Sequence, residues 1–153
     1  MLPAYAKAHG IEYSVREGWL TGCLDRLQKE KNTDAEGKIT LGIAFPSEGP
    51  LSEGKEIIDN ITYFGFNEDL SHPEIYDENL ESRFKQIFEE FKPDMIHVFG
   101  TEFPHALAAL KAFGRPERSL VWMQGVCTEI AKAYMAGIPK KVQESTTFRD
   151  RLK

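Results

Sequence analysis

Short apolar runs alternate along the chain with segments in which apolar residues recur every three or four positions. The runs lie at residues 39–45 (ITLGIAF), 95–99 (MIHVF) and 120–123 (LVWM). Each run is short, rich in β-branched or aromatic residues and flanked by turn residues, a pattern typical of buried strands. The sequence therefore predicts a strand at each of the three places.

Between the strands, the apolar spacing predicts amphipathic helices. Two segments place apolar side chains along one helical face: Leu80, Phe84, Ile87, Phe88 and Phe91 in one, and Trp19, Leu20, Cys23, Leu24 and Leu27, after Gly18, in the other. Pro104 suits the first turn of a third helix and Gly114 its C-terminal end. A fourth helix is predicted over 128–136.

The segment 55–66 (KEIIDNITYFGF) has two β-rich arms joined by Asp59 and Asn60. Both residues tolerate positive φ, which a two-residue hairpin turn requires. Strands that alternate with helices predict an α/β fold, a three-layer sandwich around a mostly parallel central sheet.

Composition narrows the class of protein. The 153 residues suit one domain, and the net charge of -5 disfavours a nucleic-acid binder, which needs a basic face. The sequence offers neither a signal peptide nor an apolar run long enough to span a bilayer, so we expect a cytoplasmic protein. Cys23 and Cys127 have no metal-site spacing and are expected to be small buried hydrophobic residues.

Candidate chemistry gathers where strands end, because ligands of open parallel sheets bind beyond the carboxyl ends of the strands. In the junction HVFGTEFPHA, Glu102 is a functional candidate or an exposed loop acid, and Thr101 is a ligand contact or a helix cap. His105 is a sugar or acceptor contact, with a neutral imidazole, or an exposed helix residue. His97 is expected to be a core histidine whose ring nitrogens have hydrogen-bond partners. Gly18 either lets the backbone approach a diphosphate closely or simply permits a tight turn.

The sequence contains neither a dinucleotide-binding glycine motif nor a P-loop, and no catalytic triad or carboxylate pair can be assembled from it. From pattern alone, the prediction is an α/β domain with a ligand site at one edge of its sheet.

Several segments taken in order resemble family 4 glycosyltransferases. FKPDMIHVFGTEFPHALAALKA resembles a strand and helix in the N-terminal half of that family, and LVWMQGVCTEIAKAYMAGIP resembles the next strand and helix, as found in a bacterial subgroup. EGWLTGCLDRL is similar to the glycine-bearing loop and first helix, GIAFPSEG to the second strand, and IIDNITYFGF to a segment that often follows it.

The resemblance implies a glycosyltransferase-B fold, in which a Rossmann-like N-terminal domain receives the acceptor and a C-terminal domain holds the sugar nucleotide. It implies transfer with retention of configuration and no obligatory metal or other cofactor. Thr101, Glu102 and His105 would line the acceptor side, and Gly18 would approach the donor diphosphate. Gln124 and Gly125 stand where many members carry a histidine that contacts the transferred sugar.

Two elements of that family have no counterpart between residues 1 and 153. One is the donor domain with its E-x7-E motif, and the other is the apolar first strand, which is central in the family's sheet. We therefore expect residues 1–153 to be an acceptor-side domain that is inactive alone, with a homodimer formed by strand exchange or a poorly ordered N-terminus.

The expected partners are a sugar nucleotide donor, a sugar or lipid-linked acceptor such as a cell-envelope precursor, and the donor domain. The basic segment RDRLK leaves peripheral contact with the inner membrane open for the full-length protein. The alternative is a stand-alone Rossmann-like or flavodoxin-like binding or regulatory domain.

Overall fold

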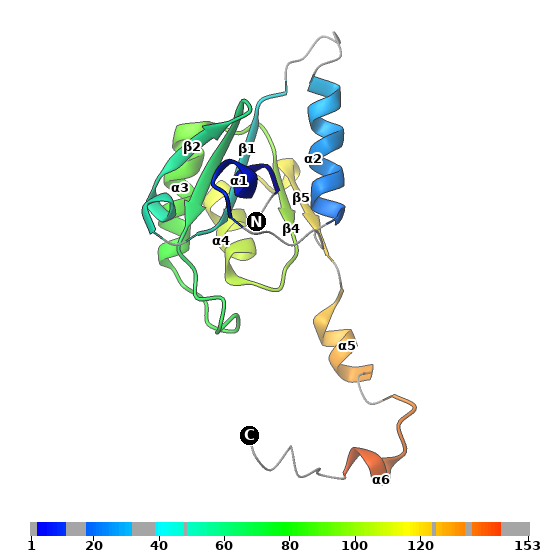
Figure 1. Ribbon diagram of the computed structural model, residues 1–153. Helices are drawn as coiled ribbons and strands as arrows, with labels where there is room; N and C mark the ends of the chain where they lie inside the picture. Colours follow the sequence, from blue (N-terminus) through cyan, green and yellow to red (C-terminus); the bar gives the residue numbers. More distant parts are fainter. Residues whose placement is uncertain are drawn as a thin grey trace. The chain divides into compact units, whose positions relative to one another are not determined.

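The computed structural model describes residues 3–11, 18–31, 39–47, 49–123, 125–133 and 136–144. The chain divides into two compact units, Met1–Trp122 and Met123–Lys153, and each is described by itself. The first unit carries all the described strands and four of the helices (Figure 1).

Three strands form the first sheet, in the order β1 (Leu41–Pro46), β3 (Ile61–Phe66) and β2 (Lys55–Ile58). β1 pairs with β3 in parallel, and β2 pairs with β3 in antiparallel. The turn between β2 and β3 has Asp59 at φ 52 and Asn60 at φ 59. Two successive residues with positive φ match the right-handed twist of a hairpin. The predicted hairpin and its turn are confirmed.

A second sheet consists of β4 (Ile96–Phe99) and β5 (Ser119–Trp122), paired in parallel. The predicted strands are thus present, and two of the three strand pairings are parallel. The mixed α/β class is confirmed. The described strands form two sheets and not one, so the three-layer sandwich around a single central sheet stays a prediction.

Helix α3 (Asn79–Phe91) contains the predicted apolar stripe, and α4 (Pro104–Phe113) begins at Pro104 and ends before Gly114, as predicted. Each ends on a left-handed residue, Lys92 at φ 54 and Gly114 at φ 63, whose N–H bonds a carbonyl of the last turn. Together the two helices cover one face of β3. The buried core there comprises Phe64, Phe66, Leu80, Phe84, Ile87, Ala108 and Ala109.

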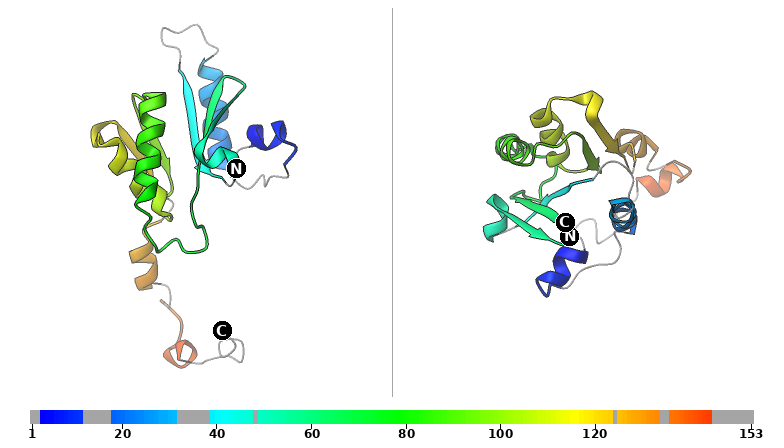
Figure 2. Two further views of the ribbon diagram at one scale, coloured as in Figure 1. Left: turned by 90° about the vertical axis from the view of Figure 1, so that its left-hand side faces the viewer. Right: turned by 90° about the horizontal axis from the view of Figure 1, so that it is seen from above.

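The other face of β3 packs against α1 (Pro3–Ala8) and α2 (Gly18–Lys31), which Figure 2 shows on the side opposite α3 and α4. The buried core of this side comprises Tyr5, Leu24, Ile61 and Tyr63. Cys23 of α2 is a free thiol and is half-buried, so it is less enclosed than the sequence predicted. The side chain of Cys127 lies outside the described residues.

Two short 3-10 helices, η1 (Gly49–Glu53) and η2 (Pro116–Arg118), complete the first unit. η1 lies so close to β3 that a Cβ added to Gly65 would be 2.2 Å from the Leu51 carbonyl oxygen. Arg83 of α3 donates hydrogen bonds to the carbonyl oxygens of Gly65 and Gly54, at 2.9 and 2.8 Å. These contacts hold β3, η1 and α3 together.

The expectation that His97 is a core histidine is wrong. Ile96 and Val98 point into the core that α4 provides, so the alternate residue His97 lies on the other face of β4, where it is exposed. Leu120 and Trp122 of β5 are 41% and 45% exposed on the same strand pair. No described element covers this face closely enough to bury these side chains.

The second unit contains α5 (Cys127–Ala133), where a helix over 128–136 was expected, and α6 (Lys140–Gln143). None of its described side chains is buried, and Ile130 and Val142 are 54% and 56% exposed. Among the described residues of the whole chain, no helix has the length and apolar character that crossing a membrane requires.

Candidate ligand site at the carboxyl ends of the strands

The candidate site lies where β3 and β4 end, at the lower edge of the first unit in Figure 1. Two loops leave the sheets there. The loop 67–78 follows β3 and leads to α3, and the loop 100–103 follows β4 and leads to α4. Contacts between Glu68 and His105 bring the first loop to the start of α4. The carboxyl ends of strands are the usual position of ligand sites in open α/β sheets.

Glu68 and His105 form the most enclosed polar contact of this edge. The Glu68 side chain is only 2% exposed, and its Oε2 lies 2.6 Å from Nδ1 of His105. Its second oxygen, Oε1, accepts a hydrogen bond of 2.9 Å from the backbone N–H of His105. The carboxylate thus binds one residue twice, through its main chain and through its ring.

The same contact supplies the missing cap of α4. Phe103 is the N-cap residue and makes no side-chain cap bond, and Pro104 has no N–H to satisfy. Glu68 accepts a hydrogen bond from the His105 N–H in the first turn, where the helix dipole also favours a negative charge. The interpretation of Thr101 as a helix cap is therefore wrong. Phe103 is the N-cap residue, and Glu68 from another loop accepts the hydrogen bond of the first turn.

The imidazole of His105 contacts two aromatic rings. The Phe103 ring stacks on it at 5.9 Å with an interplanar angle of 8°, and the Phe66 ring is tilted at 5.3 Å. The side chain is 21% exposed. No hydrogen bond joins Nε2 of His105 to a described residue. Among the described residues, the hydroxyl of Tyr63 is the fully buried side-chain atom that lacks a partner, so Nε2 is not fully buried. Nε2 can therefore exchange a hydrogen bond with a ligand.

Thr101 and Glu102 lie in the loop that leads to His105, and both are exposed. The Glu102 carboxylate folds back and accepts a hydrogen bond of 2.8 Å from the Thr101 N–H. A Cβ on Gly100, at φ 88, would be 2.4 Å from this carboxylate, so the loop needs glycine there. The structure thus brings three sequence candidates to one edge, with Glu102 satisfied by its own loop.

The remaining candidates are not brought to this edge by any described contact. Gly18 is the first residue of α2, and a Cβ built on it would meet nothing within 4 Å. Its approach to a diphosphate stays a prediction. Gln124 lies outside the described residues. Gly125 belongs to the second unit, where a Cβ would be 2.7 Å from Cδ1 of Ile130.

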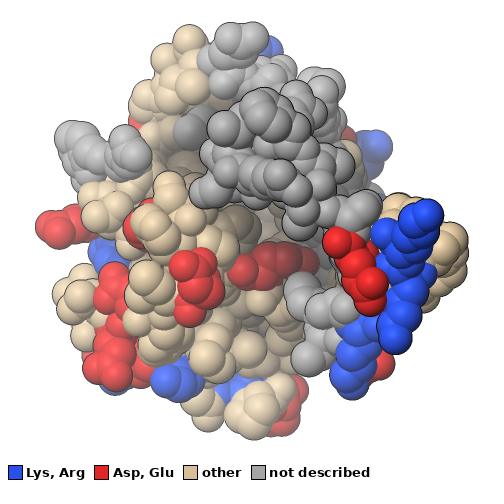
Figure 3. Space-filling model, turned by 90° about the horizontal axis from the view of Figure 1, so that it is seen from below, with Lys and Arg blue, Asp and Glu red and all other residues tan. Residues whose placement is uncertain are grey.

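The loop 67–78 makes this edge acidic. It carries five acidic residues, Glu68, Asp69, Glu74, Asp77 and Glu78, and no Lys or Arg. Figure 3 views this end and shows Asp and Glu side chains on it. A hydrogen bond from the His72 ring to Asp69, at 2.7 Å, and one from the Ser71 N–H hold the pKa of Asp69 below its usual value. An anionic ligand meets repulsion here.

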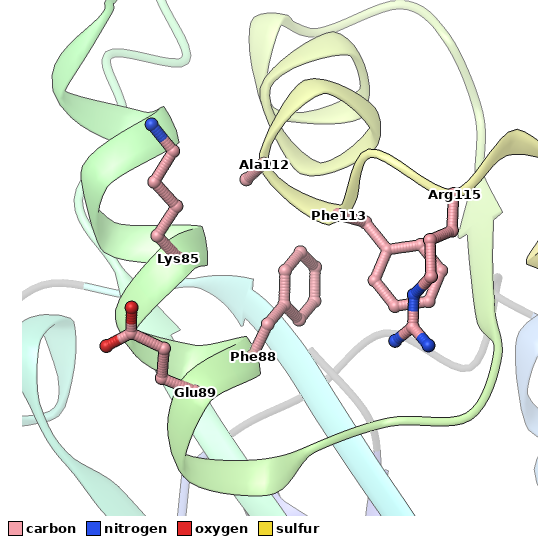
Figure 4. A pocket seen from close by; sticks show the side chains of 6 residues that line it. All are labelled: Lys85, Phe88, Glu89, Ala112, Phe113 and Arg115. Atoms are coloured by element: carbon pink, nitrogen blue, oxygen red, sulfur yellow. The ribbon is translucent and has the colours of Figure 1, made fainter.

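A shallow cavity of about 210 Å³ lies elsewhere, toward the C-terminal ends of α3 and α4 (Figure 4). Phe88 and Phe113 line it, and the guanidinium of Arg115 lies 4.3 Å from the centre of the Phe113 ring. Arg115 also donates to the Pro93 carbonyl oxygen. This arginine has structural partners, and the cavity holds none of the candidate residues, so we place the functional site at the edge near His105.

Glu68 is the residue that sequence reasoning missed. It follows β3 by two positions, and the segment around it shows only a break in the hydrophobic pattern. One signal was available in the sequence. Glu68 is an acidic residue just after a strand, and the carboxyl end of that strand lies at the same edge as the start of a helix. Among the described residues, no group of three or more His, Cys, Asp or Glu side chains is arranged to hold a metal ion.

Comparisons with protein-family models, with curated proteins and with solved structures found no match to this chain. Any assignment of family or activity therefore rests on the residues and contacts described above.

Proposed function

We propose that this chain is the acceptor-side domain of a retaining glycosyltransferase that uses a sugar nucleotide. The donor domain, including an E-x7-E motif, is then supplied by sequence beyond residues 1–153. In this proposal the two sheets belong to one Rossmann-like, three-layer domain. The acceptor, a glycan or a lipid-linked precursor, binds at the edge that carries Thr101, Glu102 and His105.

The observation that carries the proposal is the pairing of Glu68 with His105. A ring that is held by a buried carboxylate and keeps one nitrogen that is not fully buried is a fixed hydrogen-bonding group at a ligand edge. Sugars are recognised by such groups together with aromatic rings, and Phe103 stacks beside this one. The order of the resembling segments along the chain is the second support.

The first test is the gene. Sequence that continues past Lys153 with an E-x7-E motif supports the enzyme, and a stop codon directly after Lys153 favours a stand-alone binding domain. The second test is turnover. The 153-residue chain alone should not consume any sugar nucleotide, because the proposal assigns donor binding mainly to the other domain, and consumption by the isolated chain contradicts it.

Kinetics of the full-length protein give the third test. His105→Ala should raise the KM for the acceptor about tenfold, the equivalent of about one hydrogen bond, and leave the KM for the donor unchanged. His72→Ala is the matched control, because His72 is an exposed histidine in the loop 67–78 whose ring is bonded to Asp69. Equal effects of the two variants, or an effect of His105→Ala on the donor alone, contradict the assignment.

A further inference from the structure

We infer that Glu68 is a positioning residue that fixes His105 in the Nδ1–H tautomer and leaves Nε2 as a bare acceptor for a hydroxyl group of a ligand without negative charge. This inference deepens the proposed function and rests on it for the ligand. The part that concerns the ring itself rests on the contacts alone.

The tautomer follows from the hydrogen bonds that Glu68 makes. An ionised carboxylate can only accept hydrogen bonds. Its Oε1 is occupied by the His105 N–H at the start of α4, where the helix dipole favours the charged carboxylate. Oε2, 2.6 Å from Nδ1, must then accept from that nitrogen, so the ring proton of the neutral imidazole lies on Nδ1. Nε2 is left with its lone pair.

Packing holds the ring in this orientation. The Phe103 and Phe66 rings contact the imidazole, and the enclosed position of Glu68 prevents water from replacing its two bonds. Nε2 is not fully buried, so it is the part of this arrangement that a ligand reaches. A bare ring nitrogen accepts a hydrogen bond and therefore selects a donor such as a hydroxyl group.

The charges around the ring narrow the class of ligand. The loop 67–78 contributes five acidic residues and the loop 100–103 contributes Glu102, and neither segment contains Lys or Arg. The cation described against the first loop, Lys111 of α4, lies 4.5 Å from the centre of the Tyr76 ring and is paired with Glu81. A phosphate or carboxylate that approaches Nε2 is repelled by these side chains and also by the ring lone pair. A sugar hydroxyl meets neither penalty.

The tautomer is measured on the 15N-labelled 153-residue chain by long-range proton–nitrogen NMR of the histidine rings. His105 is assigned by the signal that disappears in His105→Gln. In the neutral ring, Nδ1 of His105 should show the shift of a protonated nitrogen and Nε2 that of a bare one. A ring with its proton on Nε2 in the wild-type chain overturns the inference without any variant.

Glu68→Gln switches the tautomer if the inference is right. The amide oxygen can accept the backbone N–H, and the amide nitrogen then faces Nδ1 as a donor, which moves the ring proton to Nε2. Glu102→Gln is the matched control, because the Glu102 carboxylate accepts a hydrogen bond from the Thr101 N–H and, among the described contacts, none from His105, so it should leave the His105 ring unchanged. An unchanged ring in Glu68→Gln, with the backbone amide spectrum preserved, overturns the positioning role.

The ligand class is tested with methyl α-glucoside and glucose 1-phosphate, two probes that differ in the phosphate. The uncharged glycoside should move the Nε2 resonance of His105 in the wild-type chain, and the phosphate ester should move it much less. An equal response to both overturns the ligand class. The predicted tautomer with no response to the glycoside leaves the role of Glu68 standing and contradicts both the ligand class and the proposed function.

Discussion

The hydroxyl of Tyr63 provides a test of how the first unit is held together. Tyr63 lies in β3 and is 0% exposed, and its hydroxyl has no hydrogen-bond partner. Its ring packs against those of Tyr5 and Phe45, with ring centres 5.4 and 6.3 Å away. A buried hydroxyl that gives up water without a new partner destabilises the folded state.

Tyr63→Phe removes this hydroxyl and keeps the ring. Leaving a buried polar group unsatisfied costs about 1–3 kcal/mol. The small void left by the oxygen offsets part of that gain. We therefore expect the free energy of unfolding to rise by about 1 kcal/mol, which corresponds to an increase in Tm of about 2–4 °C for a chain of this size.

Urea denaturation at neutral pH measures the change as a shift in midpoint at constant slope. Tyr76→Phe is the matched control, because the Tyr76 hydroxyl donates a hydrogen bond of 2.7 Å to Oε1 of Glu81. The same substitution at Tyr76 should lower the stability. A loss of stability in Tyr63→Phe refutes the reasoning, since it shows that the hydroxyl has a partner in solution.

The free energy of unfolding at alkaline pH gives an independent measurement. Burial, with a smaller contribution from the charge of Asp59, raises the pKa of Tyr63 above its ordinary value of 10.0. Above pH 10.0 the unfolded chain ionises first and binds fewer protons than the folded chain, so the stability falls as the pH rises. Tyr63→Phe should lose less stability over this range than the wild-type chain.

Three further predictions concern packing and charge. Gly65→Ala places a Cβ 2.2 Å from the Leu51 carbonyl oxygen and should lower the free energy of unfolding, measured by urea denaturation, by at least about 1–3 kcal/mol. Gly22→Ala, in α2, places its Cβ where nothing lies within 4 Å and should raise the same free energy by about 0.5–1 kcal/mol. Phe84→Ala empties a site that is 4% exposed and should cost about 3–5 kcal/mol in the same assay. Hydrogen bonds from a tyrosine and a lysine lower the pKa of Glu81, so its contribution is present above pH 4.5 and is lost as the pH falls, and Glu81→Gln should weaken the acid dependence of unfolding.

Much of the local structure follows from the sequence because its causes are local. The hairpin turn needs two residues that accept positive φ, and Asp59 and Asn60 supply them at φ 52 and 59. The start and end of α4 are fixed by Pro104, which needs no N–H partner, and by Gly114, which takes the left-handed conformation. Helix α3 follows from a stripe of large apolar residues that a single face can bury.

The exposure of His97 could not be read from its own strand. Alternation in β4 shows that Ile96 and Val98 share one face and that His97 lies on the other, but which faces are buried depends on what packs there. The structure covers one face with α4 and leaves the other exposed, and it separates the strands into two sheets. These are properties of the packing between elements.

The candidate site shows the same division. The place of Thr101, Glu102 and His105 at a strand-to-helix junction can be predicted from the sequence, since the local pattern sets where β4 ends and α4 begins. The contact of Glu68, 37 residues earlier, with the N–H and ring of His105 is a result of tertiary packing. A contact over that separation depends on how β3 and α4 are brought together, and no local propensity encodes it.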